Sequence, residues 1–484
     1  MSLNVRFFLT CLFALAIGCT SPSTDEPPRR SAAVATTRPN VLLYLIDTLR
    51  SDRIGAYGYK YPTTPALDAL SAESFVFEQA YAPGPWTLPS VVSLMLSQPM
   101  CRHGVVIDGK KIDAESTPLA EILNDAGYAT ASFIANSYAG RPAGLERGFE
   151  VYHGPIDDPA PLVGAFLDEI PDQPFFVYVH DVRPHDPYDV TAKALAPFGP
   201  IDPTVLKRMK NRALRYRRLT RTDHSAGTKI GSTDNTTEQT EALARLDALA
   251  EPYGRAYDAR IREADDQLAA TLSELRRRGK LENTLVLVVS DHGEELGEHG
   301  GWLHDHSVYD EVVRAPLVLR LPTAEPAGHR IETPVSLLDV APTIAELTGS
   351  ATPPDAFEGK SLVPLLTTTP STSNEAFVAS MRMNAKKYYR PWKQHRGDQN
   401  LVVREGRWKA IWNVEPDTLE LYDLAQDPGE KNDRSAAEPE RTIRLKSFAR
   451  SYLEKCESRR AAPTAAEPLS AENAERLRAL GYVD

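Results

Sequence analysis

Two apolar runs of the chain end in an aspartate, and these carboxylates are the first candidates for chemistry. The runs are Val41–Asp47 and Thr284–Asp291, and His292 follows the second directly. Both are rich in Val, Leu and Ile without alternation, which is typical of strands buried on both faces. Because ligands gather at the carboxyl ends of strands in open α/β sheets, we expect Asp47, Asp291 and His292 to converge. A single Asp there usually caps a turn, but two with a histidine favour a divalent metal ion.

A hydroxyl is the second candidate. The segment Trp86–Ser97 predicts a helix with Thr87 at or near its N-cap and Pro89 in its first turn. A Thr there is ordinarily only a cap. At the mouth of a metal site it becomes a candidate nucleophile and a further metal ligand, because the helix N-terminus and a cation both favour the alkoxide. The free N–H groups of that helix end suit a tetrahedral oxyanion such as phosphate or sulfate.

Four histidines are candidates for binding or protonating a substrate. His180 and His185 lie where the strand-like run Pro174–His180 passes into a loop bounded by prolines. This loop should reach the same sheet edge, and imidazole suits both proton transfer and anion binding at neutral pH. His304 and His306 flank Asp305, and the sequence leaves open which of them points inward.

The elements that must position these residues alternate between strand-like and helical segments over residues 39–366, which predicts an α/β fold. Expected strands and helices are Val41–Asp47, Pro65–Ser74, Thr87–Ser97, Thr117–Ala126, Thr130–Asn136, Pro174–His180, Tyr253–Arg278 and Thr284–Asp291. The interval 192–251 departs from this pattern with a basic stretch and a polar run. It is either a solvated surface segment or a mobile cover over the site.

A cluster of Thr, Ser and Pro at Thr367–Ser373 predicts a second boundary. Beyond it, residues 374–484 contain two strand-like pieces, Leu401–Trp412 and Leu419–Leu424, and then a helix within Pro439–Glu457. This composition predicts a small α+β subdomain beside the main sheet.

The first 19 residues have the pattern of a secretory signal: Arg6, an apolar run and small residues before Cys19. Ala16–Cys19 resembles a bacterial lipobox, which predicts lipidation of Cys19 and residues 20–38 as a flexible tether to the membrane of a bacterial cell envelope. Plain signal cleavage and secretion is the alternative. Cys101 and Cys456 would remain, free to form a disulfide although a chain of 484 residues does not require one. The net charge of −11 argues against nucleic-acid binding. The oligomeric state is left open.

Taken together in their order, the motifs RPNVLLYLIDTLRSDRIGAYGY, APGPWTLPSVVSL, HDVRPHDPY, NTLVLVVSDHGEELGEHG, SLLDVAPTIAELTG and LYDLAQDPGEKN resemble the sulfatase family of the alkaline phosphatase superfamily. The resemblance spans residues 38–435. It implies a large mixed β-sheet sandwiched by helices, with a smaller C-terminal subdomain. Carried over by position, it implies that Asp47, Asp291 and His292 bind metal and that Thr87 is the nucleophile. It further implies that His185 and His304 act on the substrate, to which His180 and His306 are added as candidate contacts.

Two departures from the family pattern bear on the chemistry. The family's formylglycine motif is Cys or Ser, any residue, Pro, Ser, Arg, whereas this chain reads Thr87-Leu-Pro-Ser-Val91. Thr cannot yield the aldehyde, so no formylglycine is expected. Thr48 stands where calcium-binding members carry a second Asp, which moves the metal preference from calcium toward zinc or manganese.

The sequence therefore predicts a metal-dependent hydrolase of sulfuric or phosphoric esters, acting on a small-molecule or glycan ester through Thr87. A transferase of phospho-headgroups is one alternative, although such relatives carry several membrane spans. A non-catalytic lipoprotein that binds anions or glycans is another.

Overall fold

The computed structural model describes residues 38–107, 109–207, 250–322, 328–366, 375–383, 399–466 and 471–479. The expectations for the signal segment, Cys19 and nearly all of the tether lie outside these residues, as does most of the interval 192–251. No helix among the described residues has the length and apolar character needed to cross a membrane.

The expected strands and helices of the main domain are present with small shifts at their ends. The strands are β1 (Asn40–Ile46), β4 (Ala129–Ile134), β6 (Phe175–Asp181) and β7 (Thr284–Val289). The helices are α1 (Pro65–Ser71), α2 (Thr87–Leu96), α4 (Leu119–Asp125) and α9 (Ala250–Arg277). Two further long strands, β2 (Phe75–Tyr81) and β10 (Arg314–Arg320), were not expected from the sequence as strands.

In the described part of the chain, these strands form one nine-stranded sheet in the order β11-β2-β10-β7-β1-β6-β4-β5, with β12 on β2. Its short strands are β5 (Val151–His153), β11 (His329–Ile331) and β12 (Val335–Ser336). The central strand β1 pairs in parallel with both β6 and β7, whereas β10 runs antiparallel to β7. The mixed sheet is thereby confirmed, and the carboxyl ends of β1, β6 and β7 lie side by side.

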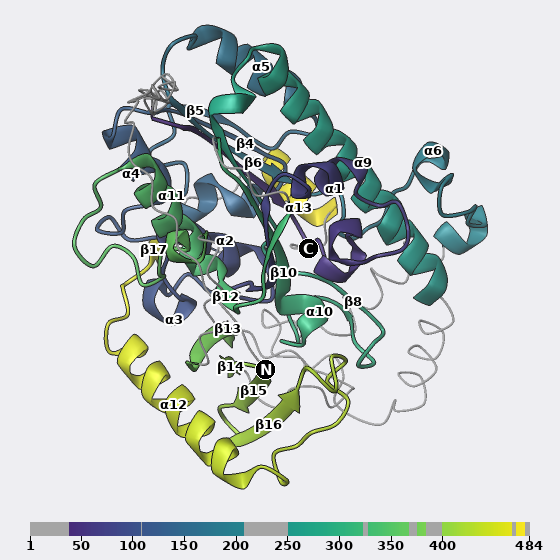
Figure 1. The fold of residues 1–484 in the computed structure, drawn as a ribbon, viewed down its shortest axis with the longest axis vertical. Helices are drawn as coiled ribbons and strands as arrows, with labels where there is room; N and C mark the ends of the chain where they lie inside the picture. Colours follow the sequence, from purple (N-terminus) through teal and green to yellow (C-terminus); the bar gives the residue numbers. More distant parts are fainter. Residues whose placement is uncertain are drawn as a thin grey trace, which may run out of the picture. The chain divides into compact units, whose positions relative to one another are not determined.

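Helices cover both faces of this sheet, which is why β1 is apolar without alternation (Figure 1). Leu42, Tyr44 and Ile46 of β1 belong to the core shared with α1, α9 and α5 (Ala160–Glu169). Val41 and Leu43 belong to the opposite core, shared with α2, α4 and α11 (Val340–Thr348). Every residue of α2 is buried. The helix that begins with Thr87 is therefore enclosed by the protein all round.

A separate four-stranded antiparallel sheet, in the order β13-β14-β15-β16, forms the predicted C-terminal subdomain with α12 (Pro439–Glu457) against it. Its strands are β13 (Phe377–Met383), β14 (Gln399–Glu405), β15 (Trp408–Asn413) and β16 (Thr418–Asp423). The treatment of Leu401–Trp412 as a single strand-like piece was wrong. It is a hairpin, because Gly406 turns the chain with a positive φ of 54°.

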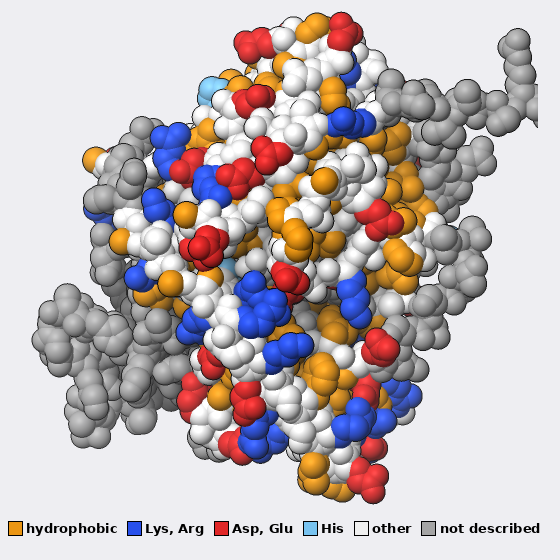
Figure 2. All heavy atoms as spheres, turned by 90° about the vertical axis from the view of Figure 1, so that its left-hand side faces the viewer, with side chains coloured by type: hydrophobic (Ala, Val, Ile, Leu, Met, Phe, Trp, Pro, Cys, Tyr) orange, Lys and Arg blue, Asp and Glu red, His pale blue; other side chains and the backbone are white. Residues whose placement is uncertain are grey.

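A disulfide and a buried ion pair are among the contacts that hold the small sheet to the main domain. A disulfide joins Cys101, in the short helix α3 (Met100–His103) after α2, to Cys456 near the end of α12. The structure thus pairs the cysteines whose pairing the sequence left open. A buried lysine of β15, Lys409, forms ion pairs with Asp310 and Glu430 at 2.7 and 2.8 Å. On the face drawn in Figure 2, acidic and basic side chains are intermingled.

The disulfide closes a loop of 355 residues, so its removal should destabilise the protein. We expect Cys456→Ser to lower the free energy of unfolding by about 2–5 kcal/mol, because the unfolded chain regains the freedom that the cross-link removes. Chemical denaturation of the variant, compared with wild type before and after reduction, measures this. Reduced wild type should match the variant, and an oxidised wild type no more stable than the variant contradicts the prediction.

Candidate active site

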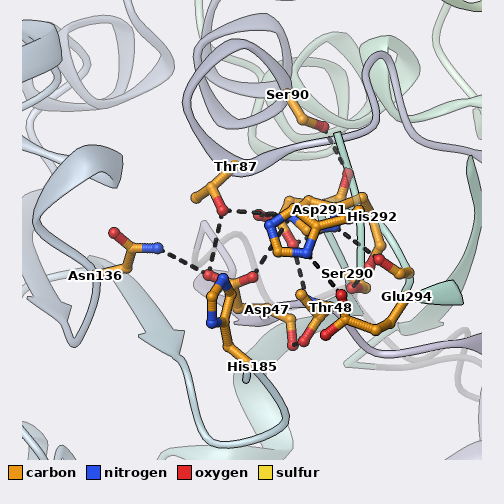
Figure 3. A network of polar contacts seen from close by, with 12 residues as sticks. Asp47, Thr48, Thr87, Ser90, Asn136, His185, Ser290, Asp291, His292 and Glu294 are labelled. Carbon is orange, nitrogen blue, oxygen red and sulfur yellow. Dashed lines mark hydrogen bonds and ion pairs between the residues drawn. The ribbon is translucent and has the colours of Figure 1, made fainter. Parts of the chain in front are cut away.

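Residues from two neighbouring strands converge at the carboxyl edge of the main sheet. Asp47 follows β1, and Asp291 and His292 follow β7, which is paired with β1 in parallel register. His292 Nε2 lies 3.6 Å from Asp47 Oδ1 and 3.5 Å from Asp291 Oδ2. All three side chains are fully buried. The structure therefore places side by side the three residues that the sequence nominated as metal ligands (Figure 3).

Thr87 is the first residue of α2, with Trp86 in the extended N-cap conformation before it. Its hydroxyl oxygen lies 3.4 Å from Asp47 Oδ2 and 3.3 Å from His292 Nε2. The helix is held in this place by Ser90, whose hydroxyl donates to the backbone carbonyl of Asp291 at 2.6 Å. The candidate nucleophile thus faces the candidate ligands, and the positive end of the helix dipole points to the same spot.

The donor set fits a divalent cation. Asp47 Oδ1 and Asp291 Oδ2 are buried oxygens without a hydrogen-bond partner, and both face His292. His292 Nδ1 lies 2.9 Å from the carbonyl of Gly293, which can only accept, so Nδ1 carries the proton and Nε2 offers its lone pair to the cluster. Burial and the charge of Asp47 raise the pKa of Asp291 well above its ordinary value. A cation among these atoms would remove the cost of keeping both carboxylates ionised.

The second oxygen of Asp47 is held by protein groups. His180 Nε2 lies 3.1 Å from Asp47 Oδ2, and Asn136 donates its amide N–H to the same oxygen at 2.9 Å. Burial opposes ionisation of Asp47, but the hydrogen bond from His180 and the nearby imidazoles hold its pKa below the ordinary value. The other nitrogen of His180 contacts the Tyr178 hydroxyl at 3.2 Å. The sequence suggested His180 as a substrate contact. In the structure its side chain is a hydrogen-bond partner of Asp47.

Asn136 was missed by the sequence reasoning, although a signal for it existed. It follows β4, which pairs in parallel with β6, so the same rule that selected Asp47 and Asp291 applies to it. Its side-chain oxygen accepts from the backbone N–H of Tyr138 at 3.0 Å, which orients its amide N–H toward Asp47.

His304 lies beside His292, and His185 lies beside His304. The ring of His304 is 4.5 Å from that of His292 and 4.9 Å from that of His185, centroid to centroid. His304 Nδ1 lies 2.7 Å from Glu294 Oε1, and the other oxygen of Glu294 accepts from the Tyr188 hydroxyl at 3.1 Å. Glu294 is fully buried. This carboxylate holds His304 with Nε2 directed away from it, a role that sequence reasoning did not anticipate.

His306 takes a different direction. Its Nε2 contacts Glu295, and its Nδ1 lies 2.9 Å from the carbonyl of His304. Of the two histidines flanking Asp305, it is thus His304 whose ring lies against His292. His299 contacts Glu311 and stacks on the ring of Tyr309, which ties the loop after His292 to the chain that follows it.

Two backbone features form the cradle of the site. Thr48 has a positive φ of 57°, a conformation that β-branched residues rarely adopt. Its N–H donates to Asp291 Oδ1 at 3.3 Å, which links the two strand ends and offsets part of the strain. Gly293 can only be glycine here, because a Cβ would lie 2.1 Å from the backbone oxygen of Glu311.

Comparison with known proteins identifies the chain as an enzyme that hydrolyses ester bonds. The chain belongs to the sulfatase family, whose model matches residues 39–350; the model of the N-sulphoglucosamine sulphohydrolase C-terminal region matches residues 297–454. It is 24% identical to the N-acetylglucosamine-6-O-sulfatase of Bacteroides thetaiotaomicron, over 89% of this chain and 87% of the relative.

Two solved structures share the fold. One, a protein in complex with its substrate D-glucosamine-2-N,6-O-disulfate, aligns with a TM-score of 0.65 and 21% identity over 87% of this chain and 99% of its own. The other is a phosphonate monoester hydrolase of Agrobacterium radiobacter, with a TM-score of 0.63 and 21% identity over 89% and 100%. The sulfatase family is thereby confirmed, and the fold is shared with a phosphonate monoester hydrolase.

If the buried cluster binds a metal, loss of one ligand should weaken binding sharply. We expect Asp47→Asn and His292→Ala each to lower the affinity for zinc or manganese by more than the roughly 10- to 100-fold that loss of an outer partner costs. Metal analysis and calorimetry of the purified proteins measure this. Asp168 is an exposed carboxylate paired with Arg278. Its substitution Asp168→Asn is the matched control and should bind the metal as tightly as wild type does. Equal affinity in all four proteins contradicts the assignment.

Proposed function

We propose that this enzyme hydrolyses sulfate or phosphate esters in a metal-dependent reaction, with the Thr87 hydroxyl as the nucleophile. The observation that carries the proposal is the place of Thr87 Oγ1, 3.4 Å from Asp47 Oδ2 and 3.3 Å from His292 Nε2. A divalent cation held by Asp47, Asp291 and His292, with zinc and manganese favoured over calcium, would favour the Thr87 alkoxide and neutralise charge on the ester.

The chain's own residues account for the covalent step. Thr87 Oγ forms a bond to the sulfur or phosphorus as the bond to the leaving oxygen breaks, and Asp47 Oδ2 lies within reach of the hydroxyl proton. Water then attacks the sulfur or phosphorus, the bond from that atom to Thr87 Oγ breaks, and a proton on Oγ restores the hydroxyl as sulfate or phosphate leaves. The first N–H groups of α2 lie next to Thr87 and suit the oxyanion.

The leaving oxygen needs a proton when it belongs to an alcohol. His304 is suited to supply it, since Glu294 accepts from Nδ1 and leaves Nε2 as the outer nitrogen. His185, whose ring lies 4.9 Å from that of His304, is suited to bind an ester oxygen.

Thr87 also separates this enzyme from formylglycine chemistry. A sulfated or phosphorylated Thr lacks the hemiacetal hydroxyl through which formylglycine releases its sulfate, so its regeneration requires hydrolysis by water, a reaction that a bound metal promotes for phosphate esters. The N-acetylglucosamine-6-O-sulfatase and the structure with a glucosamine disulfate support a sulfate ester of a glycan or small molecule as the substrate of this enzyme. The phosphonate monoester hydrolase favours phosphorus. Two of the three compared proteins are named as a sulfatase and a hydrolase, and the third binds a sulfated sugar as its substrate. These names favour hydrolysis over the transferase and binding-protein alternatives.

Substitution of Thr87 tests the nucleophile. We expect Thr87→Ala to lower kcat by about three orders of magnitude or more, because the covalent step is lost, while metal binding persists. Thr87→Ser should retain much of the activity, because the alkoxide survives. Assays with aryl sulfate, phosphate monoester, phosphodiester and phosphonate ester measure both variants, and mass spectrometry should find an unmodified Thr in wild type. Undiminished turnover by Thr87→Ala would end the proposal.

The leaving-group role of His304 predicts a dependence on the substrate. His304→Gln should slow esters of alkyl alcohols by roughly 10²–10⁴-fold, the usual contribution of a general acid, and p-nitrophenyl esters far less. Glu294→Gln should show the same pattern in weaker form. A plot of log kcat/KM against the pKa of the leaving alcohol measures it. Equal loss across all leaving groups would mean that His304 does not donate the proton.

We also propose that the enzyme is a lipid-anchored protein of a bacterial cell envelope. The pattern before Cys19 supports this, and so does the Cys101–Cys456 disulfide, since such bonds persist in oxidising compartments. We expect wild type in the membrane fraction and Cys19→Ala in the soluble fraction or left unprocessed. Wild type that is wholly soluble after signal cleavage refutes the anchor.

A further inference from the structure

A second recess lies outside the catalytic centre. It has a volume of about 650 Å³ and lies between the start of α9, the turns after β1 and the loop after β8 (Glu295–Leu296). Its walls include the apolar side chains of Phe198 and Leu296 and the rings of Tyr59 and Tyr61. None of the residues assigned to catalysis lines it. A recess of this size is typical of sites for small organic ligands.

One residue that lines the recess is a glycine inside a helix, Gly254. Gly254 lies in the second turn of α9, where glycine costs about 1 kcal/mol relative to alanine. A Cβ at this position would meet only Arg53 Nη1, at an ordinary contact distance of 3.7 Å. Packing within the described residues therefore gives no reason for glycine. A bare backbone here keeps the recess wide; a single methyl group would leave it open, whereas a bulky side chain at position 254 would fill it.

The charges around the recess are already compensated. Asp258 accepts from Arg53 at 3.2 Å and from the Tyr59 hydroxyl at 2.6 Å. Glu251 is paired with Arg255 at 2.7 Å, and Glu298, also in the wall, with Arg50 at 2.6 Å. Among the described residues that line the recess, no carboxylate is left without a basic partner to attract a cation, and no unpaired basic side chains gather to attract an anion. The recess therefore suits an uncharged ligand.

Hydrogen-bond donors nevertheless remain. Arg53 uses Nη1 for Tyr59 and Asp258, while its Nε and Nη2 have no protein partner within the described chain. Tyr59 and Tyr61 meet edge to face with centroids 5.5 Å apart, and Tyr61 is 43% exposed. Arg53 lies over one face of the Tyr59 ring at 5.3 Å, and Lys60 over one face of the Tyr61 ring at 4.9 Å. The remaining aromatic surface beside guanidinium donors matches a pyranose, whose C–H face packs on aromatic rings and whose hydroxyls accept hydrogen bonds.

We propose that this recess binds a pyranose unit of an oligosaccharide. The wall segment Leu296–Glu298 follows His292 closely in sequence, and Glu298 is bound to Arg50, which also donates to the carbonyl of Glu294 at 2.9 Å. A glycan held here stays next to the loop that carries the catalytic residues. The site binds the sugar and not the ester, so it stands whether or not Thr87 is the nucleophile.

Position 254 allows a matched test. Gly254→Phe fills the recess from a helical position, whereas Gly254→Ala makes the same backbone change and leaves the recess open. Wild type, both variants and Tyr61→Ala are applied to an array of unsulfated and sulfated oligosaccharides in the presence of a chelator. Affinities for the glycans that bind are then measured by calorimetry, and circular dichroism verifies the fold.

We expect wild type and Gly254→Ala to bind the same unsulfated oligosaccharides, and Gly254→Phe and Tyr61→Ala to bind them at least tenfold more weakly. Turnover of a small aryl ester should be unchanged in Gly254→Phe. Absence of any glycan bound by wild type, or equal affinity in folded Gly254→Phe, overturns the proposal. Since binding is read without turnover, its failure is distinct from failure of the esterase mechanism.

Discussion

The burial of two carboxylates at one edge of the main sheet is the constraint on which the site depends. Asp47 and Asp291 are both fully buried, and each leaves one oxygen without a hydrogen bond. An isolated buried carboxylate is unfavourable by several kcal/mol, so the arrangement is stable only if surrounding groups compensate it. His180 and Asn136 do so for one oxygen of Asp47. Asp47 Oδ1, Asp291 Oδ2 and His292 Nε2 are left facing one another, as a group that could hold a metal ion.

The neighbouring backbone serves this arrangement at some cost in stability. Thr48 adopts a left-handed conformation so that the chain can turn after Asp47, and Tyr257 donates to its carbonyl at 2.5 Å. The turn after Asp291 packs so closely on residues 311–312 that only Gly293 fits, with its N–H 2.6 Å from the carbonyl of Val312. Asp310, at the start of that same helix α10 (Asp310–Val313), binds Lys409 of the small sheet. The C-terminal subdomain therefore supports the loop that carries His292 and Gly293 through a buried ion pair.

Much of this could be predicted because it follows from local rules. The unbroken apolar runs of β1 and β7 implied strands buried on both faces. Because the two strands run in the same direction, Asp47, Asp291 and His292 meet at their carboxyl ends. β2 and β10 escaped notice because they lie on the antiparallel side of the sheet, where pairing depends on contacts distant in sequence. Glu294 was missed for a related reason. Its role depends on the path of the chain from His292 to His304, which no periodicity encodes.

The different positions of His304 and His306 also could not be predicted from the sequence, although only one residue separates them. Both flank Asp305, whose φ is 78°, and Leu303 before them also has a positive φ, of 70°. Such turns reverse the direction of successive side chains in a way that strand or helix periodicity cannot anticipate. One imidazole is delivered to His292 and the other to Glu295. Each histidine contacts its own buried carboxylate: His304 contacts Glu294, and His306 contacts Glu295. The four residues therefore form two His–Glu dyads. Of the two dyads, the one with Glu294 lies against His292, and the backbone turn at residues 303–305 determines this.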